Sequence, residues 1–252
     1  MTSVVCIPAC HRPEFLALTL EKIDQAIDAP DDVRIYLDHS DESRVKEIEY
    51  VRDTFLPRAL IFHAAPHIKV LSGTWNILNS IKQGYETGAE LIFFIEEDVC
   101  IRPEIFFPWH FKQMATGEYL ATCGRKDPRF YFRHPDIYTN PGSCLRHDLV
   151  AQLVPHINDE YFKRLRGYLD EKFGPWDEMS HLDDGLIRRV IRQMGGKVKF
   201  PDEAMCTHKG WAFYNKLDIY MNRGTIQERI ARLPDMMAKL KPGDRYASDF
   251  EF

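Results

Sequence analysis

The chain has 252 residues, of which 44% are hydrophobic and 28% are charged, and its net charge is −5. This length and composition predict one globular domain with a sizeable core and exclude a disordered chain, and the acidic balance argues against a general nucleic-acid coat. No apolar stretch is long enough to span a membrane and the N-terminus has no signal-peptide pattern, so we expect a cytoplasmic protein, in the host cytoplasm if it is viral.

The first half of the sequence predicts strands that alternate with helices. Apolar runs predict strands at 4–8, 33–38, 59–63 and 91–95, and helical periodicity predicts helices at 14–29, 43–55, 74–85 and 104–114. Four successive strand–helix units predict an α/β fold with a doubly wound, mostly parallel sheet and helices on both of its faces.

The second half has shorter and more irregular elements. We expect short strands at 119–123, 129–132, 197–200 and 204–208, with a turn at 140–143. We expect helices at 148–156, 159–173, 182–194 and 225–240. The sequence contains no internal repeat, and no linker separates these elements from the first half. We therefore expect the chain to form a single domain.

Three carboxylates, Glu96, Glu97 and Asp98, directly follow the apolar run that begins at Leu91. The run predicts a strand buried on both faces, and open α/β sheets bind their ligands at the carboxyl ends of such strands. Adjacent acids repel one another unless a cation compensates them, and carboxylate oxygens suit Mg²⁺ or Mn²⁺. The sequence therefore predicts a divalent-metal site with Asp98 as a ligand. A strand that ends in a solvated acidic loop is the alternative.

Five short motifs, taken in their order and spacing, point to a family. They are Val-Val-Cys-Ile-Pro-Ala-Cys-His-Arg at 4–12, Tyr-Leu-Asp at 36–38, Phe-Ile-Glu-Glu-Asp-Val at 94–99 with Pro-Glu-Ile-Phe at 103–106, Leu-Asp-Asp-Gly-Leu-Ile-Arg-Arg at 182–189 with Gly-Gly-Lys-Val at 195–198, and Cys-Thr-His at 206–208. Together they resemble the GT-A glycosyltransferases, which use nucleotide-sugar donors. The resemblance covers residues 3 to 210. The Glu-Glu-Asp metal motif and the segment between Phe107 and Met179 depart from the family pattern.

The resemblance implies a GT-A-like (Rossmann-like) fold with a smaller mixed region on the acceptor side. It divides the single catalytic domain into a nucleotide-sugar-binding half at 1–118, an acceptor and base half at 119–221, and a C-terminal helix and tail at 222–252. It implies a nucleoside-diphosphate sugar as donor, a UDP-sugar first of all, with Mn²⁺ or Mg²⁺ held by Asp98 and His208. Donor contacts are expected at Pro8, Ala9, His11, Arg12, Asp38, Glu96, Glu97 and Lys209.

Carboxylates near the start of the predicted acid-pair helix are candidates for a general base. The acceptor hydroxyl must lose its proton as it attacks the anomeric carbon, and a carboxylate on the far face of the sugar can accept that proton. We expect Asp184 in this role, with Asp183 and Asp177 behind it, and an inverting single displacement. Asp183 and Asp184 could instead be negative charges that stabilise a helix N-terminus. Asp38 could form a turn, and a lone histidine such as His208 usually has a structural role.

A basic and aromatic stretch offers a candidate acceptor surface. Residues 125–147 contain five basic residues and two acids, which gives a local charge of +3 in an acidic chain. Basic side chains for phosphates and aromatic rings for stacking suit a flipped nucleotide. We therefore expect a 5-hydroxymethyl pyrimidine in DNA as acceptor, as in the DNA-modifying glycosyltransferases of phages, with contacts from Arg129, Arg133 and Trp176. Solvated basic faces and ordinary strand aromatics are the alternative explanation.

Other functions stay open at this point. The acceptor could be a saccharide or a small molecule, and a sugar-nucleotide nucleotidyltransferase would also place acids after an α/β strand to hold Mg²⁺. Those enzymes usually carry a glycine-rich phosphate loop near the first strand, which the segment 10–13 is not. A non-enzymatic nucleotide- or sugar-binding module would keep the pocket and need no base.

Overall fold

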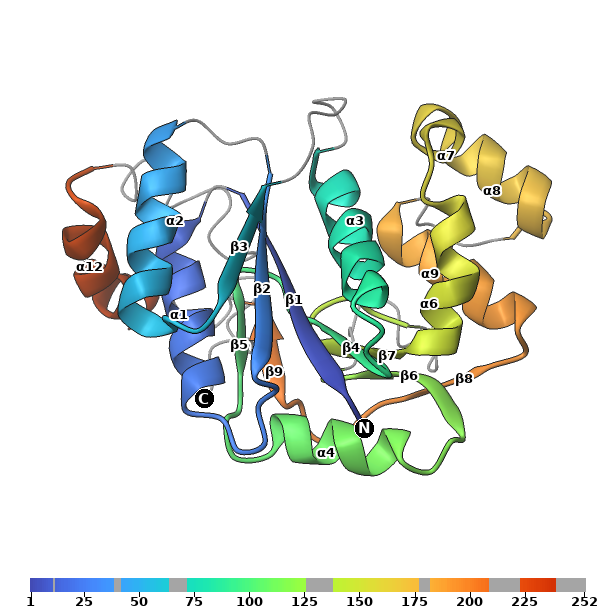
Figure 1. Ribbon diagram of the computed structural model, residues 1–252, viewed down its shortest axis with the longest axis horizontal. Coiled ribbons are helices and arrows are strands. Elements are labelled where there is room, and N and C mark those ends of the chain that lie inside the picture. The colour runs from blue at the N-terminus through green and yellow to red at the C-terminus, as the bar shows by residue number, and fades with distance from the viewer. Residues whose placement is uncertain are drawn as a thin grey trace.

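The computed structural model describes residues 1–10, 12–38, 42–63, 72–125, 138–176, 182–208 and 223–238. A seven-stranded sheet forms the centre of this part of the chain, with helices on both faces (Figure 1). Its strands, in spatial order, are β3 (Leu60–His63), β2 (Asp32–Leu37), β1 (Ser3–Ala9), β4 (Leu91–Phe94), β7 (Ser143–Arg146), β6 (Tyr119–Cys123) and β8 (Lys197–Lys199). The strand that precedes the three carboxylates, β4, therefore lies in the middle of the sheet, with all four residues buried.

The strands β1 to β4 run parallel to one another, which confirms the doubly wound arrangement predicted from the strand–helix units. In the other half of the sheet, β7 runs antiparallel to both β4 and β6, and β8 pairs with β6 in parallel. The strand β7 was not predicted. The sequence indicates a turn at 140–143, and a four-residue strand directly after a turn is too short to show a clear alternating pattern.

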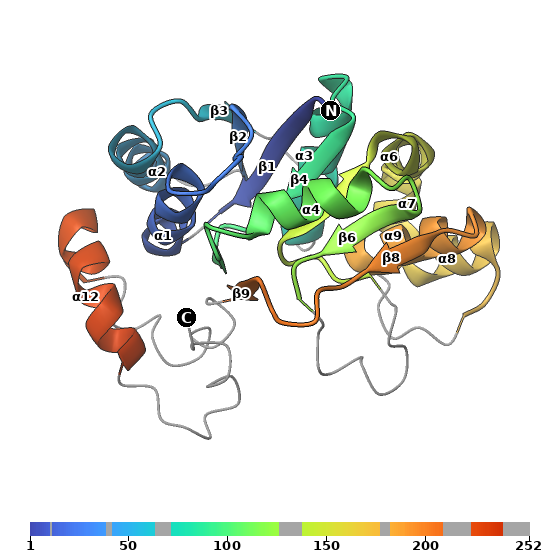
Figure 2. The ribbon, with the colours of Figure 1, turned by 90° about the horizontal axis from the view of Figure 1, so that it is seen from below.

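Two groups of helices bury the two faces of this sheet. On one face lie α1 (Pro13–Asp24), α2 (Glu42–Phe55) and α4 (Phe106–Met114), and on the other lie α3 (Ser72–Glu86), α6 (His147–Leu153) and α9 (Asp183–Gln193) (Figures 1 and 2). Along β1, Val5 and Ile7 pack with the first group, while Val4 and Cys6 pack with the second. Because both faces are covered, every position of the central strands favours an apolar residue, as the uninterrupted runs predict.

Some predicted helices differ in extent from those of the structure. The helix predicted at 14–29 ends at Asp24, and Asp28 has a left-handed φ of 57°, which an α-helix does not allow. The helix predicted at 159–173 is divided into α7 (Asp159–Arg164) and α8 (Arg166–Phe173), because Leu165 has a left-handed φ of 43°. A 3₁₀ turn (Val154–His156) follows α6, and the last helix is α12 (Ile226–Ala238). The strand predicted at 129–132 lies outside the described residues.

A second, two-stranded sheet lies beyond the carboxyl end of β4. It consists of β5 (Val99–Ile101) and β9 (Cys206–His208), which run antiparallel with Val99 opposite His208. Since β5 follows the three carboxylates in the chain, this pairing brings the histidine to the acidic turn. Within the described segments, no helix is both long and apolar enough to cross a membrane.

Candidate metal and donor site

The acidic turn between β4 and β5 presents its carboxylates from a fixed backbone. The N–H of Val99 donates to the carbonyl oxygen of Glu96 at 3.0 Å and closes the turn. From α1, the hydroxyl of Thr19 donates to the carbonyl oxygens of Glu97 and Val99 at 2.8 and 3.1 Å. These hydrogen bonds provide partners for the backbone carbonyl groups of Glu96, Glu97 and Val99, and they hold the turn at the carboxyl end of the central strand.

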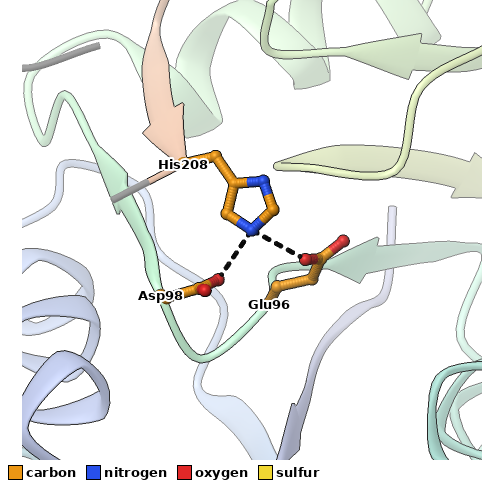
Figure 3. A group of neighbouring side chains, drawn as sticks. All are labelled: Glu96, Asp98 and His208. Carbon is orange, nitrogen blue, oxygen red and sulfur yellow. Dashed lines mark ion pairs between the residues drawn. The ribbon is translucent and has the colours of Figure 1, made fainter. Parts of the chain in front are cut away.

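Three side chains converge at one end of the small sheet, where the acidic turn enters β5 and β9 ends at His208 (Figure 3). The Nε2 atom of His208 lies 3.0 Å from Oδ1 of Asp98 and 3.1 Å from Oε2 of Glu96, and one ligand atom of each residue lies within 4.8 Å of the others. We call these three residues the ligand cluster. The Asp98 side chain is 2% exposed, while solvent reaches Glu96 and His208. Two carboxylates and one imidazole form a donor set that fits a divalent cation such as Mn²⁺.

The electrostatics of the ligand cluster favour a bound positive charge. Burial disfavours a charged imidazole, but the carboxylates of Asp98 and Glu96 outweigh this effect and raise the pKa of His208 to about 10. Burial likewise disfavours a charged Asp98, yet His208 and then Arg12 hold the pKa of that carboxyl below its usual range. In the protein without metal, His208 is thus a protonated counter-ion of two carboxylates. A metal ion would take the place of that proton, because imidazole binds metals in its neutral form.

The loop after β1 is attached to the acidic turn at two points. The N–H of Cys10 donates to Oε2 of Glu97 at 2.8 Å, and the guanidinium of Arg12 pairs with Oδ2 of Asp98. Glu97 is buried, and its carboxylate holds the backbone of this loop at Cys10. Of the three adjacent acids, Glu96 and Asp98 belong to the ligand cluster, while Glu97 supports the loop that precedes α1.

The ends of β1 and β2, which carry three of the predicted donor contacts, lie next to this loop. Pro8 and Ala9 are buried at the end of β1, and the N–H of Asp38 donates to the carbonyl oxygen of Ala9 at 2.9 Å. The buried carboxylate of Asp38 accepts a hydrogen bond from the Cys10 thiol at 3.4 Å. Asp38 therefore lies at the carboxyl end of β2, two strands away from the acidic turn.

One residue that sequence reasoning missed, Asn76 of α3, joins these strand ends. Its Nδ2 atom donates to the carbonyl oxygens of Ala9 and Tyr36 at 3.2 and 2.9 Å. Its Oδ1 atom is buried and has no hydrogen-bond partner among the described residues. A signal was present in the sequence, because an asparagine among the apolar positions of a predicted helix requires polar partners in the core.

The two adjacent acids of α9 have different surroundings. Asp183 is buried, and its carboxylate accepts hydrogen bonds from the hydroxyl of Thr74, at 3.1 Å, and from the amide of Asn140. Burial, followed by the negative charges of Asp184 and Glu96, raises the pKa of Asp183 to about 7. The pKa of Asp183 thus responds to a carboxylate of the ligand cluster.

Asp184 is the acid of this pair that solvent reaches, since its side chain is 21% exposed. Its Oδ2 atom lies 3.0 Å from a guanidinium nitrogen of Arg188, one turn further along α9. Arg188 is itself buried and donates from Nε to the carbonyl oxygen of Tyr138 at 2.7 Å. The arginine is therefore held in place and orients the Asp184 carboxylate.

Of the remaining six predicted site residues, the structure describes only Trp176. Five of them are outside the described residues: His11, Asp177, Lys209, Arg129 and Arg133. Trp176 lies against α9, where its ring centroid is 4.8 Å from the guanidinium carbon of Arg192 and 5.9 Å from that of Arg189. Of the predicted residues, the structure brings Arg12, Glu96, Asp98 and His208 into direct contact.

Comparison with known proteins identifies solved structures that have a similar fold. No protein-family model matches the chain, and no curated protein matches it in sequence. Among solved structures, it is similar to the mannosyltransferase PcManGT from Pyrobaculum calidifontis in complex with GDP-Man and Mn²⁺, with 12% identity over 96% of this chain and 77% of that chain and a TM-score of 0.57. It is also similar to S. aureus TarS, with 14% identity. The match to TarS covers all of this chain and 46% of TarS, with a TM-score of 0.53. The match to a structure of TarS residues 1–349 covers 99% of this chain and 80% of that structure, with a TM-score of 0.51. These likenesses confirm the predicted GT-A-like α/β fold.

Proposed function

We propose that this chain is a metal-dependent glycosyltransferase, which moves a sugar from a nucleoside-diphosphate sugar to a hydroxyl acceptor. The ligand cluster at the carboxyl end of the central strand is the observation that carries the proposal. The likeness to PcManGT supports it, because the structure of that mannosyltransferase contains GDP-Man and Mn²⁺. At 12% identity this likeness concerns the fold, so the ligand cluster is what extends the proposal from fold to chemistry.

Glu96, Asp98 and His208 would hold the divalent cation. When bound, such an ion stabilises the negative charge that develops on the departing nucleoside diphosphate. The imidazole of His208 favours Mn²⁺ over Mg²⁺, which prefers oxygen ligands alone. We propose that Pro8, Ala9 and Asp38 contact the nucleoside of a UDP-sugar, and that Arg12, His11 and Lys209 contact its diphosphate.

The acceptor hydroxyl must transfer its proton to a carboxylate as it attacks the anomeric carbon, and we propose Asp184 for this role. Its partial exposure and its orientation by Arg188 support the assignment. Asp183 accepts two hydrogen bonds in a buried position and would shape the pocket beside the base. Asp183 and Asp177 are the alternative bases. Attack from the face opposite the departing diphosphate inverts the anomeric configuration.

For the acceptor, we propose a 5-hydroxymethyl pyrimidine in DNA. The local charge of +3 at 125–147 and the aromatic residues among those basic side chains support this choice. Arg129 and Arg133 would contact phosphates, and Trp176, which packs on Arg192, would offer an aromatic surface next to a cation. A saccharide or a small hydroxylated molecule is the alternative acceptor.

Release of nucleoside diphosphate from a panel of nucleotide sugars tests the proposed function. The wild-type protein should release it from one donor or a few donors when Mn²⁺ is present, and chelation of the metal should stop the release. Asp98→Ala should be inactive, whereas Asp24→Asn, which changes an exposed aspartate paired with Arg58, should keep wild-type activity.

Other functions predict different results, and nucleotidyl transfer is tested in a parallel assay that supplies a nucleoside triphosphate and a sugar phosphate. A nucleotidyltransferase would release pyrophosphate from a nucleoside triphosphate and a sugar phosphate, and a binding module would retain the donor unchanged. Full activity of Asp98→Ala, or no diphosphate release by the wild type with any donor and acceptor, would contradict the proposal.

A further inference from the structure

Asp98 uses its two carboxylate oxygens for different partners. Its Oδ1 atom lies 3.0 Å from Nε2 of His208 within the ligand cluster, and its Oδ2 atom pairs with the guanidinium of Arg12. The Asp98 side chain is 2% exposed, while that of Arg12 is 25% exposed. Asp98 thus lies between the other candidate metal ligands and a cationic side chain that reaches solvent.

The backbone beneath Arg12 is anchored independently of its side chain. The carbonyl oxygen of Arg12 accepts hydrogen bonds from the N–H groups of Phe15 and Leu16 at 3.1 and 3.0 Å, which begin α1. On the other side of the loop, the N–H of Cys10 donates to the Glu97 carboxylate. Because these bonds hold the loop, the long side chain of Arg12 can leave Asp98 while the backbone stays in place.

The charges around Asp98 determine when the Arg12 side chain would leave that carboxylate. Glu96 and Asp98 are close enough to repel each other, and Arg12 compensates part of this repulsion. A divalent cation in the ligand cluster would add two positive charges beside the guanidinium, so that Arg12 and the cation compete for Asp98. The planar guanidinium is well suited to bind phosphate oxygens through two parallel hydrogen bonds, and a nucleoside diphosphate on the cation would supply such oxygens.

We propose that Arg12 is an exchangeable counter-ion, which occupies Asp98 in the protein without ligands and moves to the diphosphate once metal and nucleotide bind. This inference rests on the proposed function, since it takes a nucleoside diphosphate as the partner of the metal. Arg12 then opposes the binding of the metal alone and favours the binding of the metal together with the nucleotide. By linkage, Mn²⁺ and the nucleoside diphosphate strengthen each other's binding by the same factor.

Calorimetric titration of Mn²⁺, with and without saturating UDP or GDP, tests this role without reference to activity. In the wild type, the nucleoside diphosphate should tighten Mn²⁺ binding about tenfold or more, within the usual range of such couplings. Arg12→Gln should bind Mn²⁺ alone about tenfold more tightly than the wild type does and should lose most of the coupling. Arg12→Lys keeps the charge without the planar fork, so its binding of Mn²⁺ alone should stay weak while the coupling falls.

A matched control removes a different arginine–aspartate pair. Arg58→Gln breaks the exposed pair with Asp24 and should leave both the Mn²⁺ affinity and the coupling at wild-type values. Unchanged or weaker binding of Mn²⁺ alone by Arg12→Gln, with the coupling intact, would overturn the inference and leave the proposed function standing. If the wild type binds no Mn²⁺ with either nucleotide, both the proposed function and the inference are wrong. Thermal melting checks that each variant is folded, and the Arg12→Lys comparison decides the outcome if Arg12→Gln does not fold.

Discussion

The imidazole Nε2 atom of His208 lies 3.0 Å from Oδ1 of Asp98, and the pairing of two short strands sets this distance. Val99 of β5, the residue after Asp98, is directly opposite His208 of β9. A shift of one residue in this register would turn the histidine to the other face of the strand and away from the carboxylates. The candidate metal site therefore depends on the register of a two-stranded sheet as much as on its ligands.

Binding of Mn²⁺ should become tighter as the pH rises. The pKa of His208 is raised to about 10 in the protein without metal, so below that pH the metal must displace a proton from the imidazole. One displaced proton corresponds to about a tenfold gain in affinity per pH unit. Calorimetry between pH 6 and pH 8 measures this slope. His208→Gln should bind Mn²⁺ more weakly with a flatter pH dependence, and an equally steep slope in this variant would contradict the assignment.

Replacement of the proposed base should affect turnover much more than donor binding. Asp184→Asn removes the proton acceptor and keeps the size of the side chain, so kcat should fall by about a hundredfold or more, the usual contribution of a general base. The affinity for the nucleotide sugar should stay near the wild-type value, because a base acts mainly in the transition state. Steady-state kinetics and donor titration separate the two quantities. A collapse of donor affinity together with kcat would place Asp184 in the donor site and favour Asp183 or Asp177 as the base.

The contribution of Asp183 to stability should depend on pH. Burial raises its pKa to about 7 in the folded protein, whereas an unfolded aspartate titrates near pH ~3.9. The stabilisation from this protonated carboxyl is therefore complete below pH ~3.9 and is lost as the pH rises through about 7. Asp183→Asn cannot ionise, so its free energy of unfolding relative to the wild type should rise between pH 4.5 and pH 8.

Urea unfolding of both proteins at several pH values measures this difference. Asp24→Asn, which changes an exposed carboxylate, serves as the control. Its free energy of unfolding relative to the wild type should change little with pH. A difference between Asp183→Asn and the wild type that stays constant with pH would show that Asp183 titrates like an ordinary aspartate.

The C-terminal helix should be held in place by one buried arginine. Arg229 of α12 is 4% exposed, and its guanidinium lies 2.5 Å from Glu14 of α1 and 2.6 Å from Glu47 of α2. Arg229→Met would leave two carboxylates without their shared cation and should lower the free energy of unfolding by about 3–5 kcal/mol. Arg232→Met, at an exposed position of the same helix, should change it by less than about 0.5 kcal/mol. Equally small effects of the two substitutions in chemical denaturation would show that the two ion pairs of Arg229 contribute little.

The affinity for duplex DNA with 5-hydroxymethyl pyrimidines should fall steeply with salt. Each phosphate contact adds about 0.9 to the slope of log affinity against log salt concentration, so Arg129→Ala combined with Arg133→Ala should make the slope shallower by about 2. Arg58→Ala, remote from the basic stretch in the sequence, should leave the slope unchanged. Sugar transfer to small hydroxylated molecules but never to hydroxymethylated DNA would rule out the DNA acceptor, while the glycosyltransferase proposal would stand.

Local sequence patterns are sufficient to predict the four parallel strands in the first half of the chain and the helices between them. Strands β1 and β4 can be predicted because both faces of each strand are buried. A strand in that environment has an uninterrupted apolar run, which is visible in the sequence. The position of Asp98 after β4 followed from the same local pattern. Asp183, Asp184 and His208 are candidate site residues because of the order and spacing of the motifs that contain them. Such motifs can be recognised in a single sequence.

How these residues are combined depends on contacts that only the folded chain makes. The sequence predicts a donor contact for Glu96, and only the structure shows that its carboxylate also lies 3.1 Å from the imidazole of His208. The sequence ranks Asp184 before Asp183 as the base but does not show that Asp183 is the buried one, and it contains no sign that Arg12 pairs with Asp98. Register, burial and ion pairing depend on contacts between segments that are distant in the chain. Local periodicity contains no record of such contacts, because the free energy that selects them is gained only when the sheet and its helices assemble.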